Sequence, residues 1–292
     1  MTAPVKISFS GHDSFACRSI WLKKGYDFVK NGNSFNSPDA VIALGVGKNM
    51  VTAIRYWMRA FNILDTDDRL TPLAEKLLAD DGWDPYLEDE GSLWLLHYHL
   101  IKKEYATTFN LIFNELRKSK IEFSKDYFVK YVMNKFEKES SFKNTNNTVG
   151  ADFMVFLKMY FSNPDAKEKE DIIGGVLTEL KLLRQIKREK EEIYLIQDTD
   201  GDTLPDELIY YAIAENPAYG QSVSLHTIAN DKNSLGAVFA LNQTGIIRKL
   251  ERLMEKYPEE IIFKDDAGVK EIQFRTGKKN PLTILEHYYH AH

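Results

Sequence analysis

Four aspartates in a short acidic stretch have the spacing of ligands in a calcium-binding loop. They fall at loop positions 1, 3, 5 and 9 and are Asp198, Asp200, Asp202 and Asp206. Position 6 holds Thr203 instead of glycine, and position 12 holds Ile209 instead of a bidentate glutamate. The spacing indicates a divalent-cation site. An acidic turn that caps the following helix is the alternative, because aspartates also serve as helix caps.

A histidine followed by an aspartate lies near the N-terminus, within Phe9–Phe15. Histidine accepts protons near neutral pH, and a carboxylate beside it can activate water or bind a metal ion. A second carboxylate group follows Trp83. The candidate catalytic residues of the two stretches are His12, Asp13, Asp84 and Glu88, with Asp89 beside them. Helix capping and local hydrogen bonds are the alternative role for both stretches.

Two helices joined by a tight turn are predicted between residues 37 and 61. Ser37 caps the first helix, and Pro38 occupies its first position, where the missing N–H is tolerated. Gly45 and Gly47 end that helix, because glycine adopts the left-handed backbone that such a turn needs. The second helix has apolar residues at helical spacing, namely Val51, Ile54, Met58 and Phe61.

This segment indicates DNA binding, because the first residues of the second helix of a helix-turn-helix face bases and phosphates. Lys48 and Asn49 occupy these positions. The candidate DNA contacts of the whole chain are Lys23, Lys24, Lys48, Asn49, Arg55, Arg59, Arg248 and Lys249. A phosphate-binding P-loop is excluded, because Ile42 and Asn49 stand where its first glycine and its Ser or Thr are required. A helical hairpin buried in a core is the alternative.

Charge is unevenly distributed along the 292 residues, whose net charge is −5. Residues 1–60 hold eight Lys and Arg against three Asp and Glu, whereas residues 61–100 hold two against ten. A basic face on an acidic protein can bind phosphates locally, and two ordinary solvated faces are the alternative. The single cysteine excludes an internal disulfide and a cysteine cluster for zinc. Without a signal peptide or a membrane-length apolar run, the expected location is the cytoplasm.

The predicted fold is mainly α-helical, with helix-turn-helix or winged-helix-like N-terminal and C-terminal parts joined by a helical middle. The expected domains are residues 1–100, 101–175 and 176–292. The last domain shows the order helix, helix, helix, hairpin, which is typical of a winged helix. Its elements are predicted at residues 205–214, 225–230, 242–257, 260–264 and 269–275. Such domains bind DNA or serve as protein-interaction modules, and both roles remain open.

Several stretches together resemble a bacterial family, the SspB-type DNA nickases of DNA phosphorothioate modification, long catalogued as a domain of unknown function. The most specific stretches are Phe9–Phe15, Trp21–Tyr26, Leu44–Met50 and Asp81–Asp89. The resemblance covers nearly the whole chain. This sequence departs from the family at Asp13, where glutamate is usual, and the acidic stretch at 198–202 is not a family feature. No established nuclease signature is present.

The resemblance implies an anti-phage defence protein that nicks one DNA strand so that sulfur can replace a phosphate oxygen. It implies three partners: a cysteine desulfurase, an ATP-pyrophosphatase-type sulfur-transfer enzyme and an ATPase. Phosphodiester hydrolysis commonly uses a metal-activated water, so Mg²⁺ or Mn²⁺ is the expected cofactor. The alternative is a non-catalytic DNA-binding adaptor or transcription-regulator-like protein, which binds double-stranded DNA without cleaving it.

Overall fold

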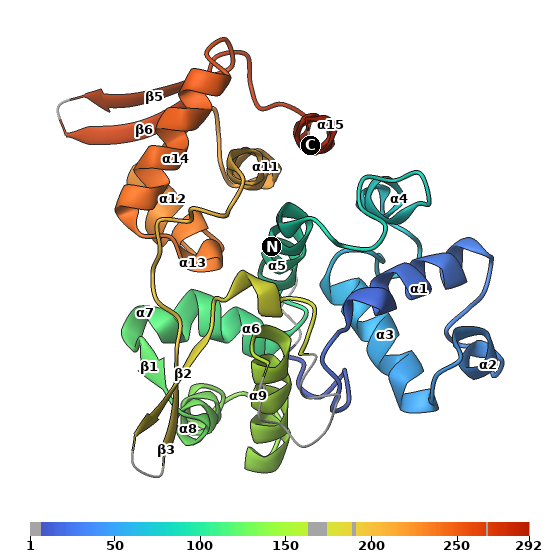
Figure 1. The fold of residues 1–292 in the computed structure, drawn as a ribbon. Coiled ribbons are helices and arrows are strands. Elements are labelled where there is room, and N and C mark those ends of the chain that lie inside the picture. Colours follow the sequence, from blue (N-terminus) through green and yellow to red (C-terminus); the bar gives the residue numbers. More distant parts are fainter. Residues whose placement is uncertain (1–6, 163–173, 189–190, 267, 292) are drawn as a thin grey trace. The chain divides into compact units, whose positions relative to one another are not determined.

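The computed structural model describes residues 7–162, 174–188, 191–266 and 268–291. The chain divides into two compact units, Met1–Ile196 and Gln197–His292. Helices make up most of the described elements of both units, so the predicted mainly α-helical class is confirmed (Figure 1). None of the helices in the described ranges combines the length and apolar character needed to cross a membrane.

The first unit is built mainly from helices. They are α1 (Ser19–Lys30), α2 (Ala40–Leu44), α3 (Lys48–Ala60), α4 (Pro72–Leu78), α5 (Glu90–Lys102), α6 (Thr107–Leu111), the π-helical turn η1 (Ile112–Leu116), α7 (Arg117–Ser119), α8 (Lys125–Lys135), α9 (Asn146–Tyr160) and the 3₁₀ helix η2 (Thr178–Leu180). Hydroxyl caps set three of the starts. The Thr71 hydroxyl accepts from the N–H of Ala74 at 3.1 Å, and Ser124 and Thr145 cap α8 and α9 in the same way.

A small sheet completes the first unit. Its strands are β1 (Glu122–Phe123), β2 (Arg184–Arg188) and β3 (Glu191–Leu195), antiparallel in the order β1-β3-β2. Because β3 pairs with β1, the hairpin formed by β2 and β3 belongs to this unit, whereas the sequence assigned residues 176–196 to the C-terminal domain. The structure likewise groups residues 1–100 and 101–175 in one unit.

Aromatic side chains form the core around α6 and α9. Phe109 and Phe113 contact Phe156 and Tyr160 with ring centroids 5.3–6.5 Å apart. The Trp57 ring of α3 joins them, 5.7 Å from Phe109. All five side chains are at most 1% exposed. These aromatics therefore pack the interior and have no surface for base stacking.

The second unit combines five helices of the described part with a three-stranded antiparallel sheet of order β4-β6-β5. Its elements are α11 (Asp206–Glu215), β4 (Ser222–Ser224), α12 (Leu225–Asn230), α13 (Leu235–Phe239), α14 (Gln243–Lys256), β5 (Ile261–Asp266), β6 (Val269–Phe274) and α15 (Pro281–His290). Three predicted helices and the predicted hairpin are confirmed within a few residues. Strand β4 and helices α13 and α15 were not predicted.

Candidate nucleic-acid interface

The turn between α2 and α3 is closed by glycine. Gly45 ends α2 in the left-handed conformation, with φ of 58°. Its N–H donates to the carbonyl of Ile42 at 3.1 Å, and the N–H of Val46 donates to Val41 at 3.2 Å. These bonds satisfy carbonyls that the end of a helix leaves unpaired. The two predicted helices and the left-handed turn at Gly45 are thus confirmed. The predicted helix start at Ser37 and Pro38 is wrong, because Ser37–Asp39 forms a turn and α2 begins at Ala40. Gly47 is extended, with φ of −65°, and precedes α3.

The first turn of α3 has no anionic cap. Gly47 precedes the helix and offers no side chain, and no acidic residue lies in the first turn. Lys48 and Asn49 are exposed. The first N–H groups of a helix lack intrahelical acceptors and carry partial positive charge, which attracts anions. This end of α3 can therefore accept a phosphate group.

Three side chains at the turn are available for an external partner. Lys24, Lys48 and Asn49 make no side-chain hydrogen bond or ion pair with any residue of the described ranges. The Nζ atom of Lys24 lies 4.0 Å from where a Cβ atom at Gly45 would stand. We call these three residues, together with the first N–H groups of α3, the turn site. It presents positive charge and an amide beside unpaired backbone donors.

The other residues of α1 and α3 that were predicted to contact DNA are already paired with carboxylates of this unit. The Lys23 ammonium is 2.6 Å from Asp27 and 2.7 Å from Asp80, and its side chain is 7% exposed. Arg55 and Arg59 both donate to the carboxylate of Asp68. Here the basic and acidic segments of the sequence neutralise one another. Of the predicted contacts in the described part of this unit, Lys24, Lys48 and Asn49 are those without such partners.

His12 is buried with 0% exposure and lies between aromatic rings and a carboxylate. Its ring is stacked on Trp57 with centroids 5.1 Å apart, and Nε2 is 2.9 Å from Oδ1 of Asp152 in α9. The same oxygen accepts from the N–H of Ser10 at 2.6 Å. A base that activates water must reach the substrate. In this arrangement His12 fastens the N-terminal motif to α9 and does not face solvent.

The other candidate catalytic residues lie in separate local structures. Asp84 is 8% exposed, and its two carboxylate oxygens accept from the N–H groups of Glu88 and Asp89 at 2.9 and 3.0 Å. Asp89 in turn caps α5 through the N–H groups of Gly91 and Ser92. Asp13 and Glu88 are exposed. These contacts of Asp84 and Asp89 shape the loop before α5.

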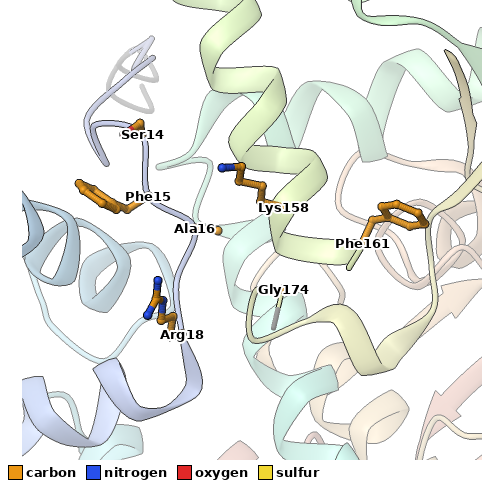
Figure 2. Close-up of a pocket in the computed structure, with 7 residues that line it drawn as sticks. All are labelled: Ser14, Phe15, Ala16, Arg18, Lys158, Phe161 and Gly174. Carbon is orange, nitrogen blue, oxygen red and sulfur yellow. The ribbon is translucent and has the colours of Figure 1, made fainter. Parts of the chain in front are cut away.

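A small pocket lies beside the N-terminal motif. Its volume is about 50 Å³, and Figure 2 shows Lys158 extending from α9 towards the segment that carries Ser14 and Ala16, with Arg18 on the far side. About 10–15 Å³ of such space holds one water molecule, so the pocket suits a few waters. It is too small for a nucleotide.

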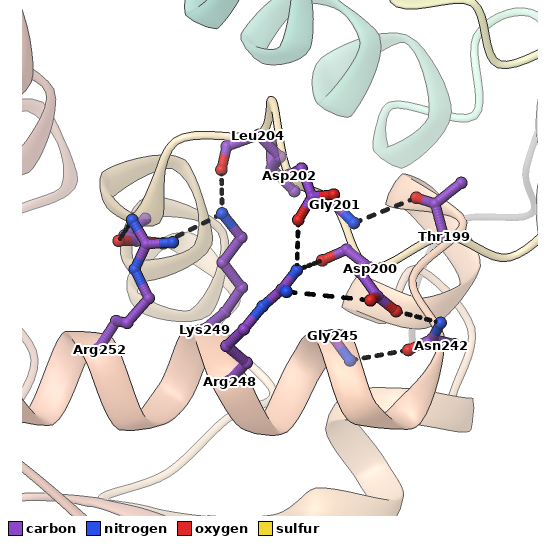
Figure 3. Close-up of polar contacts among 11 residues, drawn as sticks. Thr199, Asp200, Gly201, Asp202, Leu204, Asn242, Gly245, Arg248, Lys249 and Arg252 are labelled. Atoms are coloured by element: carbon purple, nitrogen blue, oxygen red, sulfur yellow. Dashed lines mark hydrogen bonds and ion pairs between the residues drawn. The ribbon is translucent and has the colours of Figure 1, made fainter.

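The acidic loop before α11 is held by an arginine. Arg248 of α14 donates to the carbonyl of Asp200 at 2.9 Å and to the carboxylate of Asp202 at 2.6 Å (Figure 3). Asn242 donates to the Asp200 carboxylate at 2.6 Å. The backbone of Asp200 packs against Gly245, where a Cβ atom would come within 2.7–2.9 Å. A guanidinium group therefore neutralises the carboxylates that resemble calcium ligands, while Asp198 is exposed.

Asp206 also has cationic partners from α14. Its carboxylate is 3.1 Å from the ammonium of Lys249 and 2.8 Å from Arg252. Lys249 is 1% exposed, and burial lowers its pKa although Asp206 favours the charged form. One turn further, Lys256 pairs with Glu207. Along α14 the cations at 248, 249, 252 and 256 thus face carboxylates of their own unit, including both predicted DNA contacts.

No group of three or more His, Cys, Asp or Glu side chains within the described ranges is arranged to hold a metal ion. The predictions for Mg²⁺ or Mn²⁺ at the N-terminal motif and for a cation at the acidic loop therefore stay predictions. The residues that orient these sites were not foreseen. Asp152 lies among the apolar residues of α9, within the predicted helical middle, and only its polarity there signalled a buried partner.

The chain belongs to the family described as "Protein of unknown function (DUF4007)", whose model matches residues 9–289. Two solved structures are similar to it over 97% of this chain and 88% of theirs. One is described as "Magnesium ion-bound SspB crystal structure", with 28% identity and a TM-score of 0.86. The other is described as "SspB crystal structure", with 29% identity and a TM-score of 0.85. Among curated proteins no match was found. The resemblance to SspB-type proteins is thereby confirmed.

Proposed function

We propose that this chain is a DNA-binding protein of a bacterial phosphorothioate modification system and that it holds duplex DNA through the turn site. The likeness to SspB supports the system. The DNA contact is supported by one observation. Lys24 and Lys48 flank an uncapped start of α3, whereas Lys23, Lys30, Arg55 and Arg59 are paired with carboxylates. Phosphate groups supply the anions that this arrangement lacks.

The test is duplex binding measured at several salt concentrations. The slope of log K against log salt is negative, and removing one phosphate contact reduces its magnitude by about 0.9. Lys48→Ala and Lys24→Ala should each weaken binding and reduce the slope by about that amount. Lys143→Ala removes an exposed lysine from the loop between α8 and α9 and serves as the control. Equal effects of all three variants, or none, would contradict a contact at the turn site.

The second unit supports a different role. The unit has the order α11, β4, α12, α13, α14, β5, β6, with sheet order β4-β6-β5. We propose that it is a winged helix in which the short helix α13 is an addition and α14 takes the place of the helix that reads DNA. The cations of α14 are paired with acidic residues of the same unit. Since carboxylates of the same unit already pair these cations, we propose that the unit is a protein-interaction module. The likeness to SspB is the basis for expecting the cysteine desulfurase, the sulfur-transfer enzyme and the ATPase of the system as partners.

Strand nicking is the second candidate function. The observation that favours it is the magnesium ion in a similar SspB structure, because phosphodiester hydrolysis commonly uses a metal-activated water. Conversion of supercoiled plasmid to open circles, with Mg²⁺ or Mn²⁺ and with chelator, tests it. Metal-dependent nicking supports an enzyme. Binding without nicking by the folded protein supports the non-catalytic adaptor.

A further inference from the structure

Helix α2 presents apolar side chains to solvent beside the turn site. Ile42 is 80% exposed and Val41 is 37% exposed, whereas Ala40 and Leu44 of the same helix are at most 2% exposed. The helix therefore packs on the unit through Ala40 and Leu44. We call Val41 and Ile42 the apolar tip.

The apolar tip is fixed to the cationic turn. The carbonyls of Val41 and Ile42 accept from the N–H groups of Val46 and Gly45, so the tip is hydrogen-bonded to the turn that leads into α3. Figure 1 shows α2 next to the end of α3 that holds Lys48. Contact between the backbones of α2 and α1 brings Lys24 to the same turn. The tip thus lies on a surface that carries unpaired positive charge.

An apolar tip beside unpaired positive charge fits nucleic acid better than it fits a second copy of this chain. DNA presents phosphates at its outside and apolar base faces within the stack. A second copy of this chain would bring its own Lys24 and Lys48 against these lysines, and like charges repel. An isoleucine is among the side chains that architectural proteins insert between base pairs.

We propose that Ile42, supported by Val41, inserts between neighbouring base pairs of a duplex whose phosphates are held by Lys24, Lys48 and the first N–H groups of α3. This inference rests on the proposed DNA contact at the turn site. The insertion unstacks one base step and bends the duplex, and pyrimidine–purine steps are the preferred targets because they unstack most easily. Local opening would then be built into the binding of the duplex.

The test uses duplexes with 2-aminopurine at a pyrimidine–purine step, whose fluorescence rises when the base is unstacked. The protein should raise this fluorescence on binding. Ile42→Ser should abolish the rise and weaken binding about tenfold, since the buried apolar area is lost. Ile42→Met keeps an apolar side chain and should retain the rise. Ile121→Ser, at another isoleucine that is 58% exposed, is the matched control and should change neither quantity.

Two results would overturn the insertion. One is tight, salt-dependent binding without a fluorescence rise, or with a rise that Ile42→Ser leaves intact. The other is a lower molecular mass of Ile42→Ser than of the wild type in light scattering. That result would mean that the apolar tip is an interface between copies of the chain. If the folded protein binds no duplex at all, the proposed function fails together with the insertion, and this result is distinguishable from the first two.

Discussion

The Nε2 atom of His12 and the Oδ1 atom of Asp152 lie 2.9 Å apart in the interior of the first unit. The other ring nitrogen of His12 is 3.0 Å from the carbonyl of Asp13. Since a carbonyl only accepts hydrogen bonds, Nδ1 carries the proton there. The pair joins residues 140 positions apart in the sequence and so ties the N-terminal motif to α9.

The main effect of His12→Ala should therefore be a lower free energy of unfolding. Removing one partner of a buried pair leaves the other unpaired and typically costs about 3 kcal/mol or more of the free energy of unfolding. Denaturant unfolding measures it. His226→Ala, at an exposed histidine, should have little effect. Wild-type stability of His12→Ala with loss of plasmid nicking would instead assign His12 a catalytic role.

Gly47→Asp should change stability and DNA binding in opposite directions. Gly47 has the extended backbone of an N-cap, and no atom lies within 4 Å of its Cβ position. An aspartate there should cap α3 and raise the free energy of unfolding by about 0.5 kcal/mol. The same carboxylate should occupy the N–H groups proposed for phosphate and weaken duplex binding at least tenfold. Thermal unfolding and a binding titration on the same sample check both effects, and unchanged binding contradicts the proposed site.

Arg248→Ala should expose the acidic loop to cations. The half-exposed ion pairs of Arg248 contribute about 1 kcal/mol at most, so a small fall in melting temperature is expected. Without the guanidinium, Asp200 and Asp202 repel one another, and added Ca²⁺ should raise the melting temperature of the variant more than that of the wild type. Isothermal titration with Ca²⁺ provides a second measurement. A wild-type protein that binds Ca²⁺ as tightly as the variant would restore the calcium-loop interpretation.

His99 should make the protein sensitive to mild acid. Burial, reinforced by Lys103 and Lys102, lowers the pKa of His99 to about 3 from its usual value near 6.5. The unfolded chain then binds a proton that the folded chain rejects, so stability falls as pH drops from about 6.5 towards 3. The slope is about 1.4 kcal/mol per pH unit for one such group. His99→Gln should flatten the pH dependence of unfolding, and a variant with the same pH dependence as the wild type would contradict this account.

Local signals in the sequence are enough to mark several helix starts. Thr71 before Pro72, Ser124 and Ser224 are caps whose hydroxyls accept from the N–H three residues on, as such residues do by themselves. The turn at Gly45 was equally predictable, since its geometry needs only the residues beside it. Strand β4 is three residues long and pairs with β6, so its own sequence carries little periodic signal.

The partners of the candidate site residues lie far away in the sequence, and the sequence did not show these pairings. Asp202 and Arg248 are 46 positions apart, and His12 and Asp152 are 140 apart. Spacing alone placed carboxylates as metal ligands, because it could not reveal that a guanidinium from α14 reaches them. Lys48 and Asn49 could be singled out because their position at a helix start is a local property.

The pairing of β1 with β3 has a consequence for synthesis on the ribosome. Phe123 of β1 is opposite Tyr194 of β3, so β1 has no partner until the chain has been made through β3. At about 5–20 residues per second the intervening segment takes roughly 4–14 seconds. During that interval the nascent first unit exposes an unpaired strand edge and the aromatic face that Tyr194 covers at Phe153. Early chaperone engagement would fall in this window and end when the hairpin of β2 and β3 closes.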